Sequence, residues 1–348
     1  MNKEYHIIGL MSGTSLDGID LVKCIFRKKE KWDFILESCK TIEYTKYWKE
    51  RLYTLHSEGK TIIQKYDKKY GKYLGDLINK FIDENAIKVD YIASHGHTIF
   101  HQPENRYTLQ IGNGNTISDR TNITTINNFR NLDISLGGQG APLVPIGDLH
   151  LFTNYKYCLN LGGFANISEK KENIIAFDIC PVNIVINEFC KEINRTYDKN
   201  GEIARKGKII PSVLNKLNEL EYYRKEPPKS LGREWVEENI NPIFDRDNYT
   251  TEDKLSTFCE HIAIQIGLFL KNNSVLVTGG GAFNKYLIER INKYSTSEII
   301  LPKTEIIDFK EAIIFAFLGV LRLENTNNCL SSVTGAERDN CGGDIYIK

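Results

Sequence analysis

The feature that most constrains the fold is a hairpin pattern that occurs twice along the chain. Near the N-terminus, the stretches EYHIIGLM and DLVKCIFRK flank a tip rich in Gly, Ser, Thr and Asp, which runs from Ser12 to Gly18. Such a tip is typical of a turn between antiparallel strands. A second series opens at Tyr157, where KYCLNL and FANIS flank Gly162 and Gly163. The pattern predicts an α/β chain of two lobes, each starting with a glycine-turned hairpin.

Helical patterns follow each hairpin. Apolar residues recur every three to four positions in TIIQKYDKKYGKYLGDLINKFIDEN and in TEDKLSTFCEHIAIQIGLFLKNN, which indicates two amphipathic helices. The stretch FKEAIIFAFLGVLRLEN is apolar almost all round, which predicts a buried helix. A chain of 348 residues is long enough for two such lobes. We place them at residues 1–130 and 131–336, with the tail 337–348 returning to the first lobe.

Composition excludes several classes of partner. Lys and Arg together number 45, as do Asp and Glu, so the formal net charge is zero and predicts no nucleic-acid or membrane-surface partner. No stretch approaches the roughly 20 apolar residues that span a bilayer, and the apolar run before Gly13 is too short for a signal peptide. The eight scattered cysteines are interpreted as free thiols. We therefore expect a cytoplasmic protein, with a homodimer left open.

The first hairpin tip has the composition of a phosphate site. Gly13 lets backbone N–H groups approach a phosphate, while Ser12, Thr14 and Ser15 offer hydroxyl groups. Asp17 can hold Mg²⁺ directly or through water. The alternative is a well-capped turn, since these residue types are common in turns. The tip is not a P-loop, because no Gly-Lys-Ser/Thr follows.

Two further glycine clusters point to a nucleotide. Gly162 and Gly163 alone indicate only a turn, but together with the first tip they suggest two loops that grip phosphates from opposite sides. Gly279, Gly280 and Gly281 stand between a strand and a helix, where a ligand can lie against the backbone. They lack the Gly-x-Gly-x-x-Gly spacing of a dinucleotide site.

Acidic, basic and histidine side chains supply candidates for chemistry. Asp178 ends an apolar strand before a helix start, which suits a general base or a carboxylate that interacts with the helix dipole. Glu311 opens the apolar helix and has the same two interpretations. His95 suits a hydrogen bond to a polar substrate, with a structural histidine as the alternative. Arg120 and Arg130 flank a short strand and suit a carboxylate or phosphate, or are surface charges.

The order of these motifs is similar to that of a known family. The motifs GLMSGTSLDGID, SHGHT, TLQIG, GGQGAPLVP, LNLGGFANIS, PPKSLGRE, VTGGGAFN and EAIIFAF follow one another between residues 9 and 336. This succession resembles the anhydro-N-acetylmuramic acid kinase family over nearly the whole chain. The resemblance implies the two-lobed actin/Hsp70/hexokinase-like (ribonuclease H-like) α/β fold with a central cleft.

The resemblance also implies an activity. The family's enzymes are ATP- and Mg²⁺-dependent kinases that hydrolytically open 1,6-anhydro-N-acetylmuramic acid and phosphorylate its 6-oxygen. The product, N-acetylmuramic acid 6-phosphate, belongs to peptidoglycan recycling. The small-molecule partner would then be this sugar.

Residue roles follow from the same resemblance. Asp178 matches the family's catalytic aspartate, which draws a proton from water attacking carbon 1. The remaining matches are the first phosphate motif (Ser12, Gly13, Thr14, Ser15 and Asp17, the last near Mg²⁺), the second phosphate motif (Gly162 and Gly163), the adenosine motif (Gly279, Gly280 and Gly281) and the sugar contacts (His95, Arg120, Arg130 and Glu311).

The chain departs from the family at a few positions. Many members read FDTGPGN where this chain has FDICPVN, so Ile179, Cys180 and Val182 replace a threonine and two glycines. An aspartate usual in the family is Asn187 here. Asp178 itself is retained, so these neighbouring positions are where the surroundings of the substrate can differ.

Two alternatives remain open. An ordinary sugar or carboxylate kinase of the same fold would use Asp178 to deprotonate a substrate hydroxyl directly, without the addition of water. A nucleotide-binding regulator would close its lobes without turnover.

Overall fold

A computed structural model describes residues 3–244 and 249–348. The chain divides into two compact units, unit 1 formed by Met1–Leu151 with Phe309–Lys348 and unit 2 formed by Phe152–Asp308. The expected lobe boundaries near residues 130 and 336 are therefore wrong. Unit 1 extends to residue 151 and also includes the last forty residues of the chain, because a helix of that segment packs against its sheet.

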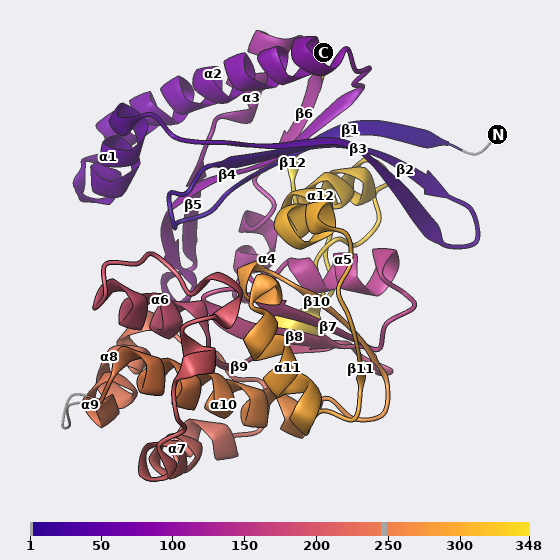
Figure 1. The fold of residues 1–348 in the computed structure, drawn as a ribbon. Coiled ribbons are helices and arrows are strands. Elements are labelled where there is room, and N and C mark those ends of the chain that lie inside the picture. The colour runs from indigo at the N-terminus through magenta and orange to yellow at the C-terminus, as the bar shows by residue number, and fades with distance from the viewer. Residues whose placement is uncertain (1–2, 245–248) are drawn as a thin grey trace. The chain divides into compact units, whose positions relative to one another are not determined.

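The sheet of unit 1 is built around the first predicted hairpin (Figure 1). Its strands run in the order β12-β6-β4-β1-β2-β3, with β5 pairing off this path to β4. β1, β2 and β3 are antiparallel neighbours, whereas β4 is parallel to β1 and β6 is parallel to β4. The strand bounds are β1 Glu4–Ser12, β2 Ile19–Lys28, β3 Trp32–Ile42, β4 Tyr91–Gln102, β5 Tyr107–Ile111, β6 Thr124–Asn127 and β12 Asp344–Tyr346.

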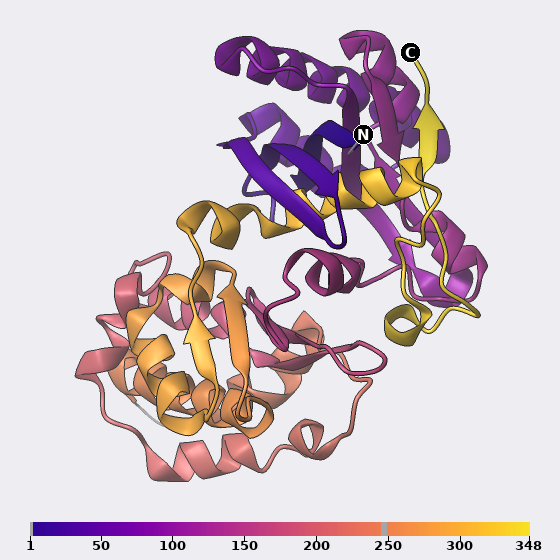
Figure 2. The same cartoon turned by 90° about the vertical axis from the view of Figure 1, so that its right-hand side faces the viewer.

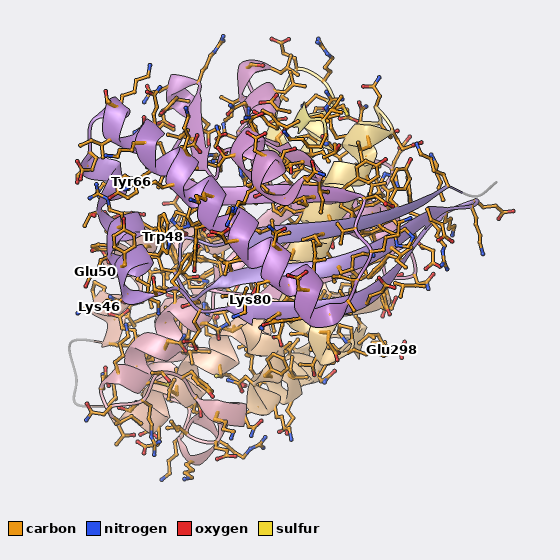
Figure 3. All side chains as sticks on the ribbon, turned by 90° about the horizontal axis from the view of Figure 1, so that it is seen from above. Lys46, Trp48, Glu50, Tyr66, Lys80 and Glu298 are labelled. Carbon is orange, nitrogen blue, oxygen red and sulfur yellow. The ribbon has the colours of Figure 1, made fainter. Side chains whose placement is uncertain are left out.

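Helices cover this sheet where periodicity predicts them. The predicted amphipathic helix forms as α2, which buries one stripe that includes Tyr70, Leu74 and Ile78. Lys80, labelled in Figure 3, is on the exposed side. The helix bounds are α1 Lys46–Thr54, α2 Lys60–Asn85, α3 Gly114–Thr121, α4 Asn131–Ser135, α5 Val144–Leu151, α12 Thr304–Leu323 and α13 Ser331–Thr334.

The packing of helix α12 accounts for the inclusion of the C-terminal segment in unit 1. A Cβ added at Gly9 on β1 would lie 2.2 Å from the Ala312 carbonyl oxygen, so helix and strand touch backbone to backbone. The helix is buried over most of its length, as predicted from its apolar composition. Lys310, in the second turn of the helix, forms a buried ion pair of 2.7 Å with Asp148 on α5. These contacts bind α5 and α12 into one core.

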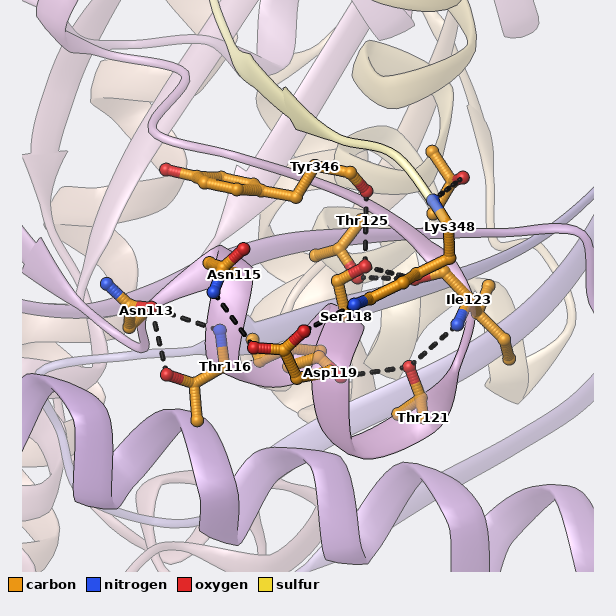
Figure 4. Close-up of polar contacts among 12 residues, drawn as sticks. Asn113, Asn115, Thr116, Ser118, Asp119, Thr121, Ile123, Thr125, Tyr346 and Lys348 are labelled. Carbon is orange, nitrogen blue, oxygen red and sulfur yellow. Dashed lines mark hydrogen bonds and ion pairs between the residues drawn. The ribbon is translucent and has the colours of Figure 1, made fainter.

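The C-terminal strand lies in unit 1. β12 pairs antiparallel with β6. Ser118 on α3 donates hydrogen bonds to the carbonyl oxygens of Ile123 and Tyr346, and the Lys348 ammonium pairs with Asp119, as Figure 4 shows. The tail 337–348 thus adds an edge strand to the sheet of the first unit.

Unit 2, drawn in magenta to orange in Figure 2, has a sheet whose strand order matches the part β6-β4-β1-β2-β3 of the unit 1 sheet. Its order is β11-β10-β7-β8-β9, with β7, β8 and β9 antiparallel and with β10 and β11 parallel to β7. The strand bounds are β7 Tyr157–Leu161, β8 Phe164–Glu169, β9 Ile175–Pro181, β10 Ser274–Thr278 and β11 Glu298–Ile300. The helix bounds are α6 Asn183–Lys191, α7 Pro211–Asn218, α8 Arg233–Asn239, α9 Asn241–Phe244, α10 Thr251–Phe269 and α11 Lys285–Tyr294.

The shared topology confirms the predicted fold class. In each unit the first strand has its two antiparallel successors on one side and two parallel strands on the other, and unit 1 adds the antiparallel β12 beyond these. This is the ribonuclease H-like arrangement, present twice. Both predicted glycine-turned hairpins join the first two strands of their units. In the two described ranges, no helix combines the length and apolarity required to cross a membrane.

Gly9 provides a test of the packing of α12. The substitution Gly9→Ala places a methyl group against backbone, which we expect to lower the free energy of unfolding by about 1–3 kcal/mol. Urea denaturation of the variant measures the effect. The control is Gly59→Ala at the start of α2, where an added Cβ meets nothing within 4 Å. Equal unfolding midpoints for the two variants would contradict the close contact.

Candidate active site

The tip of the first hairpin exposes its backbone. Leu16 N–H donates to the Gly13 carbonyl at 3.3 Å and closes a turn in which Leu16 adopts a left-handed φ of 59°. A Cβ at Gly13 would approach only the Ser15 hydroxyl, at 3.4 Å. The packing of the chain therefore does not require glycine at this position, whereas a ligand lying against the backbone would. Thr14, Ser15 and Asp17 are exposed beside it.

Ser12 lies beneath the tip and not on its surface. Its side chain is 1% exposed, and its hydroxyl contacts the hydroxyl groups of Tyr44 and Tyr70 and the Nδ1 atom of His97. Burial raises the pKa of Tyr44 to about 12 and lowers the pKa of His97 to about 4, so all these groups are neutral near pH 7. The predicted hydroxyl contribution of Ser12 to a ligand is corrected: this side chain anchors the hairpin from inside.

His95 and Arg130 form a pair in unit 1. Both Nε and Nη2 of Arg130 point at the His95 Nε2 atom, at 3.1 and 2.9 Å. The other ring nitrogen of His95 lies 3.0 Å from the Gly96 carbonyl, so Nδ1 carries the proton and Nε2 accepts. Burial, and next the Arg130 charge, hold the pKa of His95 well below its usual range. His95 is therefore a neutral imidazole beside a guanidinium.

Arg130 also supports the glycine cluster that the sequence singled out. Its Nη1 donates to the Gly140 carbonyl at 2.6 Å, while Gly140 N–H donates to the Asp133 carboxylate at 2.7 Å. Asp133 is fully buried, and its second oxygen also accepts bonds from Cys329, Thr334 and Asn340. Sequence reasoning gave Asp133 no role. An acid four residues before a glycine cluster is the signal that was available.

The structure separates the remaining basic and acidic candidates of unit 1. Arg120 ends α3, and its recorded contacts are with α2, namely an ion pair to Asp76 and a bond from Asn79 to its carbonyl oxygen. It does not join the His95–Arg130 pair. Glu311 on α12 has an exposed surface, yet burial of its carboxyl raises the pKa, and the charge of Arg130 opposes this rise more strongly than that of Lys310. Arg130, His95 and Glu311 thus form the polar group, without Arg120.

The second hairpin turn is held by the start of α6. Asn183 Nδ2 donates to the carbonyls of Leu161 and Gly162 at 2.9 and 2.7 Å, and Val182 N–H donates to the Gly163 carbonyl at 2.8 Å. The carbonyls of the turn are therefore bound on the protein side. A Cβ at Gly163 would meet nothing within 4 Å, so this glycine, like Gly13, leaves an open backbone.

The glycines of the third cluster, Gly279 to Gly281, differ in whether the packing of the chain requires a glycine. Gly279 has a φ of 80°, and a Cβ there would lie 2.5 Å from the Asn160 amide oxygen. A Cβ at Gly281 would lie 2.7 Å from Leu161. Packing thus requires these two glycines. Gly280 has open space, with its nearest neighbour at 3.9 Å, and lines a pocket.

That pocket lies wholly within unit 2. Its volume of about 460 Å³ is in the range of small-molecule sites. Apolar side chains are interleaved with amides, which suits a flat heterocycle carrying polar groups. The lining residues are Asn183, Ile186, Asn187, Tyr197, Asp198, Lys199, Asn200, Gly280, Phe283 and Asn284. Tyr197 and Phe283 are exposed aromatic rings. Sequence reasoning gave neither a role, although Phe283 belongs to the motif VTGGGAFN, and Tyr197 stands in no motif.

Asp178 is the best-supported base in unit 2. The sequence expectation that Asp178 ends its strand is wrong, because it is the central residue of β9. Leu231 N–H donates to its Oδ2 atom at 2.9 Å. Burial raises the pKa of the Asp178 carboxyl, and the bond from Leu231 acts in the opposite direction. Across the described residues no hydrogen bond to its Oδ1 atom is recorded. One oxygen is thus fixed, and the other is available to take a proton.

Three of the positions that depart from the family motif lie in the protein interior and not on a ligand-facing surface. Ile179, Cys180 and Val182 are all buried in the core of unit 2. Their replacement therefore changes the interior beside Asp178 and not a ligand-facing surface. Asn187 differs from them because it lines the pocket.

Candidate metal ligands are sparse. Within residues 3–244 and 249–348, no group of three or more His, Cys, Asp or Glu side chains could hold a metal ion. Asp17, an exposed carboxylate at the hairpin tip, is compatible with Mg²⁺, which is commonly held by one or two carboxylates together with phosphates and water.

Comparisons with known proteins agree with these motifs. A family model described as "Anhydro-N-acetylmuramic acid kinase" matches residues 5–348. The chain is 33% identical to the anhydro-N-acetylmuramic acid kinase of Sulfurovum sp. (strain NBC37-1), with 100% of each chain covered. It is 33% identical to the corresponding kinase of Sulfurimonas denitrificans, covering 97% of this chain and 98% of the relative. For the Acinetobacter baylyi kinase the identity is 34%, over 94% and 96% of the two chains.

Asp133 provides a test of how the glycine cluster is held. Asp133→Asn keeps the shape but replaces an acceptor by a donor, so we expect a loss of about 1–3 kcal/mol in stability and faster proteolysis near Gly137–Gly140. Asp119→Asn, which changes an exposed carboxylate, is the matched control and should change stability by less than about 0.5 kcal/mol. Unaltered proteolysis of the Asp133 variant would refute the proposed support.

Proposed function

The chain belongs to the anhydro-N-acetylmuramic acid kinase family, and we propose that it hydrolytically opens 1,6-anhydro-N-acetylmuramic acid and phosphorylates its 6-oxygen with ATP. The observation that carries the proposal is Asp178, a carboxylate in the middle of β9 with one oxygen fixed by Leu231 and with a pKa raised by burial. A carboxylate whose pKa lies nearer to neutrality is a better general base than an ordinary aspartate.

Asp178 acts on water in this proposal. Its carboxylate takes a proton from a water molecule while the water oxygen attacks carbon 1 of the sugar. The bond from carbon 1 to the bridging oxygen breaks, and that oxygen stays on carbon 6. It then forms a bond to the γ-phosphorus of ATP as the bond to ADP breaks. The products are N-acetylmuramic acid 6-phosphate and ADP.

The nucleotide contacts are divided among three glycines with open backbones. We assign the adenosine to the pocket beside Gly280, where Tyr197 and Phe283 offer aromatic faces. Gly163 and Gly13 offer backbone N–H groups to phosphate oxygens, with Thr14 and Ser15 beside Gly13. Asp17 would hold Mg²⁺, which would neutralise charge on the transferring phosphoryl group.

Arg130, His95 and Glu311 are assigned to the sugar. The guanidinium of Arg130 suits the carboxylate of the lactyl group, and neutral His95 keeps Arg130 oriented. Glu311 is exposed and suits a sugar hydroxyl or amide. A sugar contact by Arg120 stays a prediction, and it requires the Arg120 side chain to break its ion pair with Asp76.

The proposed reaction belongs to peptidoglycan recycling. A cytoplasmic location follows from the use of ATP and stays a prediction, as does a homodimer. The alternative kinase of the same fold, which phosphorylates a free hydroxyl directly, would prefer N-acetylmuramic acid to its anhydro form.

Turnover is the first prediction of this proposal. We expect ADP release from ATP and Mg²⁺ that requires 1,6-anhydro-N-acetylmuramic acid and falls at least ~10²-fold in Asp178→Asn, as loss of a general base implies. A coupled ADP assay measures both. The control for a loss of carboxylate charge is Asp119→Asn, because Asp119 is exposed. Asp198 is unsuitable for this purpose, because its carboxylate accepts hydrogen bonds from backbone N–H groups.

Three results would count against the proposal. No ADP release beyond background would refute the sugar assignment. A folded and fully active Asp178→Asn variant would show that another group is the base. Faster ADP release with N-acetylmuramic acid than with the anhydrosugar would favour direct phosphorylation.

The pKa of Asp178 makes a pH prediction. Because the base must be ionised, kcat/KM should fall as the pH falls through the pKa of Asp178. Burial raises that pKa above the ordinary value of 3.8, so the acid limb should lie above about pH 4. A pH–rate profile measures this limb. A rate that stays constant down to pH 4 would contradict the assignment.

A further inference from the structure

Asp178 lies on an edge strand of the unit 2 sheet, and another segment of the chain covers this edge. β9 is one of the two edge strands of the unit 2 sheet, so its outer backbone groups have no partner strand. At Asp178 the segment 229–231 supplies partners. Asp178 N–H donates to the Lys229 carbonyl at 3.1 Å, and Leu231 N–H donates to Asp178 Oδ2 at 2.9 Å. The segment therefore binds both the backbone and the side chain of one residue.

Tyr222 completes this set of bonds. Its hydroxyl donates to the Asp178 carbonyl at 2.7 Å, so the N–H, the carbonyl and one carboxylate oxygen of Asp178 are all bound. The Tyr222 ring is 6% exposed and packs against Trp235 and Tyr223, with centroid distances of 5.3 and 5.7 Å. The hydroxyl thus projects from a rigid aromatic cluster.

Lys229 anchors the segment by its side chain. Its ammonium lies 3.4 Å from the Tyr222 carbonyl oxygen. It also lies over the rings of Phe177, Tyr222 and Phe269, at 6.0, 4.9 and 5.5 Å from their centroids. Cation–π attraction of this kind is worth about 0.5–2 kcal/mol and increases with desolvation. Lys229 therefore connects the segment to β9, to α10 and to the Tyr222 cluster.

We propose that Tyr222 and Lys229 are positioning residues for the Asp178 carboxylate, acting through the segment 229–231 that they hold against β9. The inference rests on the proposed function, in which Asp178 is the base. Neither residue touches the sugar or the nucleotide in this account. Their effect is on where the carboxylate points.

Positioning of this kind has a kinetic consequence. With Oδ2 held by Leu231, the direction of Oδ1 is set, and Oδ1 is the atom that takes the proton. A displacement of a reacting group by about 1 Å can reduce a rate by about 10²-fold. Loss of the segment should therefore lower kcat while leaving the binding of ATP in its separate pocket unchanged.

The experiment compares neighbouring tyrosines and a lysine series in the full chain. Tyr222→Phe removes the bond to the Asp178 carbonyl. Tyr223→Phe is the matched control, because the Tyr223 hydroxyl contacts His261 instead. Lys229→Met removes the cation, whereas Lys229→Arg keeps it over the rings. The measurements are kcat, the KM for sugar and for ATP, and amide hydrogen exchange of peptides that contain residues 178 and 229–231.

We expect kcat to fall about 10-fold or more in Tyr222→Phe and Lys229→Met, with the KM for ATP within about 2-fold of the wild type. Exchange at residues 229–231 should become faster in the same two variants. Lys229→Arg should recover most of kcat, and Tyr223→Phe should match the wild type in kcat.

The opposite results are distinguishable. Wild-type turnover with an unchanged kcat in Tyr222→Phe and Lys229→Met would overturn the inference alone. So would an equal fall in Tyr223→Phe, since that would indicate a general loss of structure. A wild type without turnover would instead overturn the proposed function, and the positioning role with it.

Discussion

The arrangement of the candidate site depends on one constraint, which is that buried polar groups must be hydrogen-bonded. Three loops that the sequence motifs singled out are each held in place by the hydrogen bonds of one polar side chain. Ser12 supports the first hairpin tip, Asp133 supports the glycine cluster near Gly140, and Asn183 supports the Gly162–Gly163 turn. The bonds bind loops that lack regular structure, so a ligand meets a backbone that is already in place.

Glycines in the site serve two purposes that only the structure separates. At Gly279 and Gly281 a side chain would collide with neighbouring residues, so packing explains the glycine. At Gly13, Gly163 and Gly280 there is room for a side chain, so the reason must lie outside the packing of the chain. Close approach of a phosphate or a nucleoside to the backbone supplies that reason, and it is consistent with membership of a kinase family.

The sequence predicted the elements better than it predicted their grouping. Hairpins, amphipathic helices and the buried helix α12 follow from periods of two and 3.6 residues, which are local properties. The lobe boundaries failed because the contact of α12 with Gly9 joins residues about three hundred positions apart. Ser12 was open to a better prediction. Ile8, Leu10 and Ser12 alternate along β1 and share one buried face, while the opposite face is buried at Ile7 and Gly9, so a period of two places the Ser12 hydroxyl inside.

Contacts between distant loops were beyond sequence reasoning. The bonds from Tyr222 and Leu231 to Asp178 bridge more than forty residues and involve an irregular segment with no periodicity. The motif PPKSLGRE was recognisable, but its proximity to Asp178 was not. Similarly, the pocket beside Gly280 combines residues of α6, a loop and a short turn.

Isotopic labelling tests the central claim, which is that Asp178 activates water to open the sugar before phosphorylation. The reaction would be run in water enriched in oxygen-18, quenched early, and the product fragmented in a mass spectrometer. The account predicts one solvent oxygen at carbon 1 and none in the phosphoryl group or at carbon 6. A product with no label at carbon 1, or with label in the phosphoryl group, would contradict it.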